Sequence, residues 1–407
     1  MKLLAVLLLL SAAGASVFMF GLPRRNGGTP GQPAPAVLDG QNAFALDLYA
    51  RLRGEEGNLF FSPYSISTAL GMTYAGARGD TAAEMAKTLH FPADAEKLHA
   101  SNAALLGQLT GDGKDRGYQL NVANALWGQK GHPFLNPFLT LVRDRYRAGL
   151  SELDFAGNAE EARKTINTWV EKKTQDKIKD LLPEGSVDAL TRLVLTNAIY
   201  FKGDWASPFN KQATREGRFM TASAEAVKVP MMHQTSNFGY LDGGTFQALE
   251  MPYQGKELSM LVLLPKKADG LAELERAVTT DSLKGWVGKL RPTNVQVALP
   301  KFKMTKRFSM KQVLAEMGMP LAFRDQADFS GMDGSRELRI TGVFHKAFVD
   351  VNEEGTEAAA ATGVVVGVRS APAKLPSFVA DHPFVFVIRD QRSGSILFMG
   401  RVADPRS

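Results

Sequence analysis

The sequence predicts one large α+β domain, spanning residues 41–407, behind a short N-terminal leader. Patterns typical of amphipathic helices are concentrated in the first half of the chain, whereas patterns typical of strands dominate the second half. After residue 40, no Gly/Pro-rich linker and no internal repeat interrupts the chain. Helices followed by strands without an intervening linker favour a single α+β domain over several separate domains.

Three segments predict helices in the first half. Between residues 42 and 52, apolar side chains recur every four positions and form one face. Ser62 is a suitable N-cap and Pro63 suits a first helical turn, which predicts a helix that continues to Tyr74. Residues 159–179 place apolar side chains on one face and lysines on the other, as in a surface helix.

The later segments predict strands. Residues 258–264 form a continuous apolar run, and residues 295–299 and 347–351 alternate between apolar and polar side chains. Residues 384–388 and 396–402 are apolar runs on either side of a short polar turn, which predicts a C-terminal hairpin.

The leader differs from the rest of the chain. A basic start, an apolar stretch from Leu3 to Leu10 and small residues at Ala13 to Ala15 predict a signal peptide over residues 1–20. Because apolar residues resume at Val17, this segment would also be long enough for an N-terminal membrane anchor. Residues 21–40, rich in Gly and Pro, predict a flexible linker. We therefore expect a secreted or extracellular protein, or a periplasmic or membrane-tethered one if the leader is retained.

The composition is globular and excludes several kinds of site. Hydrophobic residues make up 44% and charged residues 22% of the 407 residues, which excludes a disordered or fibrous chain. No Cys is present, so disulfides and thiolate chemistry are excluded. The formal net charge of +6 is mild for a chain of this size and does not indicate a nucleic-acid-binding protein.

No catalytic motif is evident. The chain has neither a G-x-S-x-G nor an H-E-x-x-H motif, and residues 107–114 have the wrong spacing for a phosphate-binding loop. The six histidines show no metal-ligand spacing, and we expect His345 and His382, in strand-like contexts, to be hydrogen-bonded core residues. We therefore expect neither an enzyme nor a bound metal or cofactor.

Residues 353–370 form the one segment that these patterns leave unexplained. No side chain between Ala358 and Val368 is larger than Val, and the Ala run favours a helix whereas the Val run favours a strand. Long loops without secondary structure of their own are uncommon in compact domains and are usually functional or disordered.

Four ordered blocks of the chain resemble the serpin family. The blocks are residues 58–66 (NLFFSPYSI), 196–205 (TNAIYFKGDW), 353–362 (EEGTEAAAAT) and 378–384 (FVADHPF). The resemblance extends from about Gln41 to Asp404 and implies the serpin fold, with about nine helices around three β-sheets and an exposed reactive-centre loop.

The resemblance also implies a mechanism. An inhibitory serpin forms a covalent 1:1 complex with its target serine protease, and the cleaved loop then inserts into the central sheet as a new strand. Insertion requires that every second side chain be small enough to enter a core. The hinge and inserting face comprise Glu353, Gly355, Thr356, Ala358, Ala360 and Thr362, and the alternate residues from Thr356 onward meet this requirement. We therefore expect a monomeric suicide inhibitor.

In the family, the cleaved bond usually follows the fourteenth residue after the hinge glycine, which from Gly355 gives Arg369–Ser370. An Arg at this position fits the acidic pocket of a trypsin-like protease. Counting backward from the C-terminal blocks would instead place it near Pro372, and Val366 or Val368 would suit an elastase-like target. A non-inhibitory carrier or chaperone, or an inhibitor of a cysteine protease, are the alternatives.

Other residues match supporting positions of the family. Ser62, Ser65, Asn197 and His345 match the central polar cluster beneath the sheet, and Trp205 and Lys301 match the region where insertion begins. Residues 102–111 occupy the place of the basic heparin-binding helix of some serpins but contain no Lys or Arg, so we expect no heparin site of that type.

Overall fold

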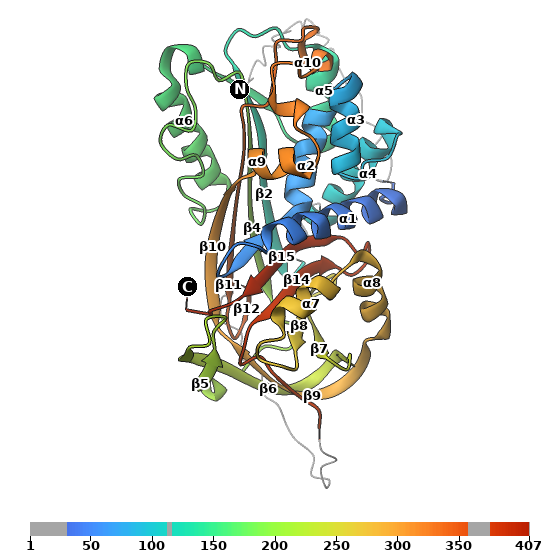
Figure 1. Cartoon of the computed structure of the whole chain (residues 1–407), viewed down its shortest axis with the longest axis vertical. Coiled ribbons are helices and arrows are strands. Elements are labelled where there is room, and N and C mark those ends of the chain that lie inside the picture. Colours follow the sequence, from blue (N-terminus) through green and yellow to red (C-terminus); the bar gives the residue numbers. More distant parts are fainter. Residues whose placement is uncertain (1–30, 112–115, 357–374, 407) are drawn as a thin grey trace, which may run out of the picture. The chain divides into compact units, whose positions relative to one another are not determined.

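The computed structural model describes residues 31–111, 116–356 and 375–406 of the chain. The leader predicted at residues 1–20 lies outside these ranges. Within them the fold is α+β, as predicted, with ten α-helices, two short 3-10 helices and fifteen strands (Figure 1). No helix among the described residues has the length and apolarity that a membrane crossing requires.

The helices precede, connect and cover the strands. In chain order they are α1 (Pro35–Leu52), α2 (Pro63–Tyr74), α3 (Gly79–Thr88), α4 (Ala95–Thr110), α5 (Asn136–Tyr146), α6 (Phe155–Lys173), η1 (Lys211–Ala213), α7 (Leu271–Ala277), α8 (Thr280–Lys289), α9 (Met310–Met317), η2 (Leu321–Phe323) and α10 (Ser330–Asp333).

Two predicted boundaries need correction. α1 begins at Pro35, so the end of the predicted 21–40 linker is helical, with Val37 and Leu38 buried. Pro suits this first helical turn because its missing N–H would have no partner there. The helix predicted over residues 159–179 ends at Lys173, and the Thr174 hydroxyl donates to the carbonyl of Val170 (2.8 Å).

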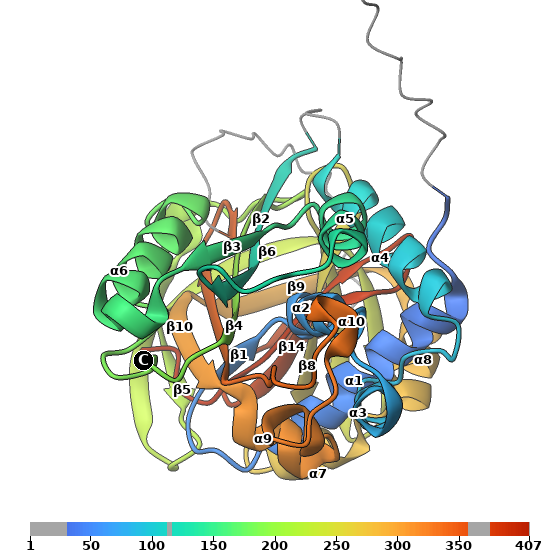
Figure 2. The same ribbon diagram turned by 90° about the horizontal axis from the view of Figure 1, so that it is seen from above.

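The central sheet has six strands in the order β10-β11-β12-β4-β2-β3. Their bounds are β2 (Tyr118–Gln129), β3 (Leu150–Leu153), β4 (Leu193–Asp204), β10 (Phe302–Ser309), β11 (Gly342–Val351) and β12 (Gly355–Thr356). α6 lies over one face of this sheet, and α2 packs against the other (Figure 2). Side chains alternate accordingly along β2, where Ala123 and Ala125 pack in the cluster under α6 and Asn124 contacts α2.

The remaining nine strands form one hydrogen-bonded assembly, which comprises the other two sheets of the fold. The strands are β1 (Leu59–Phe61), β5 (Arg215–Met220), β6 (Ala226–Asp242), β7 (Phe246–Pro252), β8 (Leu258–Pro265), β9 (Arg291–Pro300), β13 (Ser377–Val379), β14 (Phe384–Asp390) and β15 (Ile396–Val402). The long strand β6 joins the two parts, because it pairs first with β5 and at its end with β7. β14 and β15 form the predicted C-terminal hairpin.

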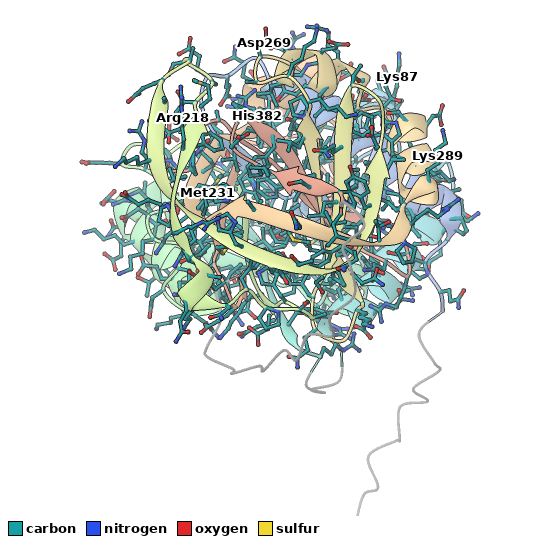
Figure 3. All side chains as sticks on the ribbon, turned by 90° about the horizontal axis from the view of Figure 1, so that it is seen from below. Lys87, Arg218, Met231, Asp269, Lys289 and His382 are labelled. Carbon is teal, nitrogen blue, oxygen red and sulfur yellow. The ribbon has the colours of Figure 1, made fainter. Side chains whose placement is uncertain are left out.

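β6 and β9 cross the end of the domain as one band (Figure 3). Charged side chains such as Lys87, Asp269 and Lys289 lie around the rim of this view, whereas Met231 and His382 lie inside it. His382 is buried, and its Nε2 donates to the carbonyl of Pro265 (2.6 Å). The expectation that His382 is a hydrogen-bonded core residue is confirmed.

Candidate functional site

The central sheet is closed at one end and opened at the other by a short strand. β4 and β11 pair in parallel from Val194 and Gly342 as far as Tyr200 and Phe348. Beyond these residues, β12 lies between the two strands and pairs with both: Thr356 is opposite Val351 on one side and Gly203 on the other. Gly355 and Thr356, two residues of the predicted hinge and inserting face, therefore already occupy the sheet.

Two glycines make room for β12. A Cβ on Gly355 would lie 2.1 Å from the carbonyl oxygen of Gly203, closer than any real contact. A Cβ on Gly203 would lie 2.9 Å from the ring of Tyr253. Gly355, predicted as a hinge residue, is thus required by the close approach of the two backbones.

Thr356 is fully buried, and its hydroxyl lies 2.8 Å from that of Tyr253. The ring of Tyr253 stacks on Trp205, with centroids 4.7 Å apart and planes inclined by 10°. Trp205 donates through its backbone N–H to the carbonyl of Glu354 (2.8 Å) and through Nε1 to that of Asn352 (3.0 Å). The structure thus places Trp205 beside the hinge, and it adds Tyr253, which lies far away in sequence.

Glu353 anchors the turn that precedes β12. Its carboxylate pairs with Lys301 (2.9 Å) and accepts a hydrogen bond from the Thr214 hydroxyl (2.8 Å). Burial alone would raise the pKa of Glu353, but the bonds from Lys301 and Thr214 outweigh burial and lower it. The neighbouring Glu354 forms an ion pair with Lys211. Lys301, which matches the family's region where insertion begins, is thus paired with the first hinge residue, Glu353.

A buried polar cluster lies between α2 and the closed part of the sheet. The backbone N–H of Ser62 donates to Nε2 of His345 (3.1 Å), so the ring carries its proton on Nδ1 and donates there to Oδ1 of Asn197. Burial lowers the pKa of His345 to about 3, so the ring is neutral at physiological pH. The Ser62 hydroxyl caps α2 and donates to the carbonyl of Leu397 (2.7 Å).

Asn124 completes this cluster. The amide nitrogen of Asn197 donates to the hydroxyl of Ser65 (2.6 Å), which in turn donates to Oδ1 of Asn124 (3.1 Å). Asn124 returns a bond from its Nδ2 to the carbonyl of Ser65 (3.2 Å). The structure brings together all four residues predicted for the cluster. The sequence missed Asn124, whose role depends on its pairing opposite Asn197 across β2 and β4.

The rest of the predicted site, namely Ala358, Ala360, Thr362, Arg369 and Ser370, lies outside the described residues. The described chain resumes at residue 375 and leads into β13, which pairs in parallel with β9. Along the chain, residues 357–374 therefore link β12 of the central sheet to β13 of the nine-stranded assembly. In the described parts of the chain, no group of three or more acidic or His side chains is placed to hold a metal ion.

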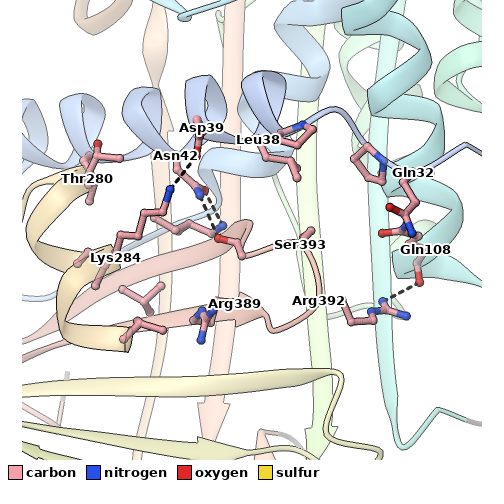
Figure 4. Close-up of a pocket in the computed structure, with 18 residues that line it drawn as sticks. Gln32, Leu38, Asp39, Asn42, Gln108, Thr280, Lys284, Arg389, Arg392 and Ser393 are labelled. Carbon is pink, nitrogen blue, oxygen red and sulfur yellow. Dashed lines mark hydrogen bonds and ion pairs between the residues drawn. The ribbon is translucent and has the colours of Figure 1, made fainter. Parts of the chain in front are cut away.

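A separate cavity of about 710 Å³ lies between α1, α8 and the β14–β15 hairpin (Figure 4). Apolar side chains such as Leu38 and Leu283 line it together with charged ones. Lys284 faces Asp39 across it at 4.0 Å, and Arg392 donates to the carbonyl of Gln108 (3.2 Å). None of the hinge or cluster residues lines this cavity.

Comparison with protein families and sequences gives consistent matches. The model of the family described as Serpin (serine protease inhibitor) matches residues 39–405. Leukocyte elastase inhibitor from Bos taurus is 44% identical over 372 residues, which cover 89% of this chain and 97% of the relative. Serpin B3 from Homo sapiens is 42% identical over 389 residues, which cover 91% of this chain and 100% of the relative.

Solved structures agree. Serpin48, described as a highly specific serpin of the insect Tenebrio molitor, matches with a TM-score of 0.81 and 34% identity over 90% of this chain and 98% of that one. Human thyroxine-binding globulin in complex with thyroxine matches with a TM-score of 0.83 and 31% identity, over 91% of this chain and 100% of that one.

These relatives overturn the predicted location. Their sequences are matched almost completely, whereas about a tenth of this chain has no counterpart in them. Leukocyte elastase inhibitor and serpin B3 are intracellular serpins without a signal peptide, which conflicts with export. The prediction of a secreted, extracellular, periplasmic or membrane-tethered protein is therefore wrong.

The family match spans nearly all of the described domain, and its relatives include proteins named as inhibitors of a protease rather than as enzymes. The expected absence of catalytic activity agrees with these relatives. By sequence, by fold and by the hinge between β4 and β11, the chain belongs to the serpin family of serine protease inhibitors.

Proposed function

We propose that the protein is a suicide inhibitor of serine endopeptidases that traps its target by inserting the cleaved reactive loop between β4 and β11. The observation that carries this proposal is β12, whose two residues already pair with both strands at the open end of the central sheet. The protease serine attacks the carbonyl carbon of the scissile residue, the peptide bond to the next residue breaks, and the new amine leaves with a proton. The protease is then held as an acyl-enzyme on the segment that inserts.

The free energy for insertion comes from completing the sheet. Each hydrogen bond of a new ladder contributes about 0.5–1.5 kcal/mol, so a strand of about a dozen residues contributes on the order of 10 kcal/mol. Thr356 enters toward the core, and the residues at every second position after it are Ala358, Ala360 and Thr362. These small side chains add little volume to a closed interior.

For specificity, we propose Arg369–Ser370 as the cleaved bond and a trypsin-like protease as the target. Arg369 is the only Lys or Arg between Glu357 and Lys374. An elastase-like target is the second candidate, because relatives at 43–44% identity are named leukocyte elastase inhibitors and Val366 or Val368 would suit such a protease. We do not propose activation by heparin, because residues 102–111 contain no Lys or Arg.

A carrier function without inhibition is favoured by one observation, the cavity of about 710 Å³ between α1 and α8. A structural relative, human thyroxine-binding globulin, has been solved in complex with thyroxine. The small side chains that follow the hinge favour inhibition over this alternative, because a carrier does not need a loop that can enter the sheet.

The test is to mix the purified protein with trypsin and, separately, with elastase, and to examine the mixtures on a denaturing gel. A band at the summed mass that survives denaturation, with protein and protease in a 1:1 ratio, supports the proposal. Sequencing the released peptide identifies the cleaved bond. Cleavage by both proteases without any such band would refute the inhibitory function and leave the carrier function as the better explanation.

A further inference from the structure

The hydroxyl of Tyr253 lies 2.8 Å from that of Thr356, the first residue whose side chain enters the central sheet. We infer that Tyr253 is a positioning residue for insertion: it holds Thr356 in the sheet before the reactive loop is cut, and it thereby favours the start of insertion. The inference rests on the proposed function, because it names the residue that presets the hinge of that mechanism.

Tyr253 is held in a fixed position by its neighbours. It is completely buried, stacks on Trp205 at 4.7 Å and meets the edge of Phe201 at 5.0 Å. Its backbone forms a β-bridge with Trp205, and its N–H donates to the carbonyl of Leu258 (2.9 Å). A side chain that packing has already immobilised loses little further conformational entropy when it binds a partner.

The same aromatic pair holds the turn before Thr356. Trp205 donates to the carbonyls of Asn352 and Glu354, and Tyr253 bonds to Thr356 itself. The hinge is therefore attached to the Trp205–Tyr253 pair at three points that follow one another along the chain. Two of these bonds go to backbone carbonyls, so only the bond from Tyr253 depends on the identity of the hinge side chain.

The hydroxyl pair is isolated from water. Thr356 and Tyr253 are both 0% exposed, so a hydroxyl that loses its partner there cannot turn to solvent. Burial raises the pKa of Tyr253, so its hydroxyl stays protonated at physiological pH. Withdrawal of Thr356 from the sheet therefore breaks a buried hydrogen bond, and the hinge is biased toward the inserted position.

Tyr253→Phe removes the hydroxyl and keeps the ring that stacks on Trp205. The net strength of one hydrogen bond corresponds to about a two- to tenfold change in an opening equilibrium. We expect hydrogen exchange of the Thr356 amide in the uncut protein to become faster by this factor. We also expect more inhibitor to be consumed per trapped protease, because insertion then starts from a hinge that is more often withdrawn.

Three variants make the test specific. Tyr240→Phe removes a tyrosine hydroxyl far from the hinge, one that is only partly buried and accepts a bond from Gln247 (2.8 Å), and it should change neither readout. Thr356→Val keeps the side-chain volume but leaves the buried hydroxyl of Tyr253 without a partner. In this background Tyr253→Phe should not speed exchange further and should tend to slow it, because it removes that unpaired hydroxyl. Thr356→Ser keeps the hydroxyl and should remain sensitive to Tyr253→Phe.

Unchanged exchange at Thr356 in Tyr253→Phe would overturn the inference, as would an effect of equal size in the Thr356→Val background. If Tyr253→Phe fails to fold, the exchange rates of Thr356→Val and Thr356→Ser decide, because only the valine variant should open more often. Exchange is measured without a protease. A wild-type protein that traps no protease would therefore refute the proposed function while the exchange experiment still decides the role of Tyr253.

Discussion

Asn124 of β2 lies directly opposite Asn197 of β4, and the amide nitrogen of Asn197 donates a hydrogen bond to the Oδ1 of Asn124. Through Ser65, this pair fastens α2 to the closed part of the central sheet. The contact lies at the strand that must move away from β11 if the sheet expands, so its polar groups need partners both before and after that movement.

Asn124→Ala should destabilise the protein. It leaves the hydroxyl of Ser65 without its acceptor in a buried site, which costs about 1–3 kcal/mol. The measurement is the midpoint of thermal unfolding at one fixed scan rate. Gln119→Ala on the same strand is the control, because Gln119 is only partly buried. Equal losses in the two variants would contradict a special role of the cluster.

Acidification should destabilise the protein partly through His345. Its pKa is about 3 in the folded protein and about 6.5 when unfolded, so the unfolded chain takes up the proton first as the pH falls. The stabilisation is complete above pH ~6.5 and declines by about 1.4 kcal/mol per pH unit toward pH ~3. His99, whose pKa burial lowers to about 4, acts in the same direction.

The check compares unfolding midpoints of the wild type and of His345→Asn from pH 7 to pH 4. The variant starts from a lower stability, and its midpoint should fall less steeply with acid because one titrating group is gone. Parallel curves would show that His345 does not contribute to the acid sensitivity.

Thr356→Arg should convert the inhibitor into a substrate. Thr356 is completely buried between β4 and β11, and an unpaired charge there costs several kcal/mol. Insertion would then be slower than hydrolysis of the acyl-enzyme, and the protease should leave active. Glu357→Arg, one position along and on the opposite face of the predicted strand, is the matched control and should still inhibit. A stable complex with Thr356→Arg would refute insertion at this site.

Arg369→Glu should abolish inhibition of trypsin and leave the melting temperature unchanged, because a carboxylate cannot enter the acidic pocket of a trypsin-like protease. The rate of inhibition of trypsin and of elastase should be measured for the wild type and the variant. Inhibition of elastase that survives the substitution would place the cleaved bond at another residue, such as Val366 or Val368.

Cutting the reactive loop should stabilise the protein. A net gain of even ~5 kcal/mol from the added strand would raise the melting midpoint by roughly ten degrees or more, taking ~2–4 °C per kcal/mol. Calorimetry of the intact and the cleaved protein at one scan rate is the measurement. A cleaved form that melts at or below the intact form would favour a loop that stays outside the sheet.

Local patterns predicted three of the helices and five of the strands that the structure describes. The Ser62–Pro63 start of α2, the apolar run of β8 and the β14–β15 hairpin follow from capping, periodicity and turn residues, which act over a few positions. The end of α6 at Lys173 was missed because the chain leaves the helix through left-handed backbone angles at Gln175 (φ 52°) and Asp176 (φ 59°), which no local residue pattern indicates.

The parts of the site that the sequence left out depend on pairing between distant segments. No local sequence pattern indicates a role for Asn124. Tyr253 is likewise an aromatic residue after a strand, and nothing near it in the sequence marks it as part of the site. Their roles follow only when β2 is aligned with β4 and when Tyr253 is bridged to Trp205. The resemblance supplied Ser62 and Asn197 from within the four blocks, and His345 as a matching family position outside them. Asn124 and Tyr253 also lie outside the blocks, and the resemblance did not point to them.

The direction of β12 has a topological consequence. The short turn from Asn352 to Glu354 reverses the chain, so β12 forms a hairpin with β11 and runs antiparallel to both of its neighbours. Growth of the sheet therefore only lengthens a hairpin that is already closed, without a crossover or any threading of the chain. Each step would exchange evenly slanted parallel bonds between β4 and β11 for two antiparallel ladders, which are slightly more stable per residue. Insertion would thus extend β12, the short sixth strand of the sheet, between strands that already pair with it.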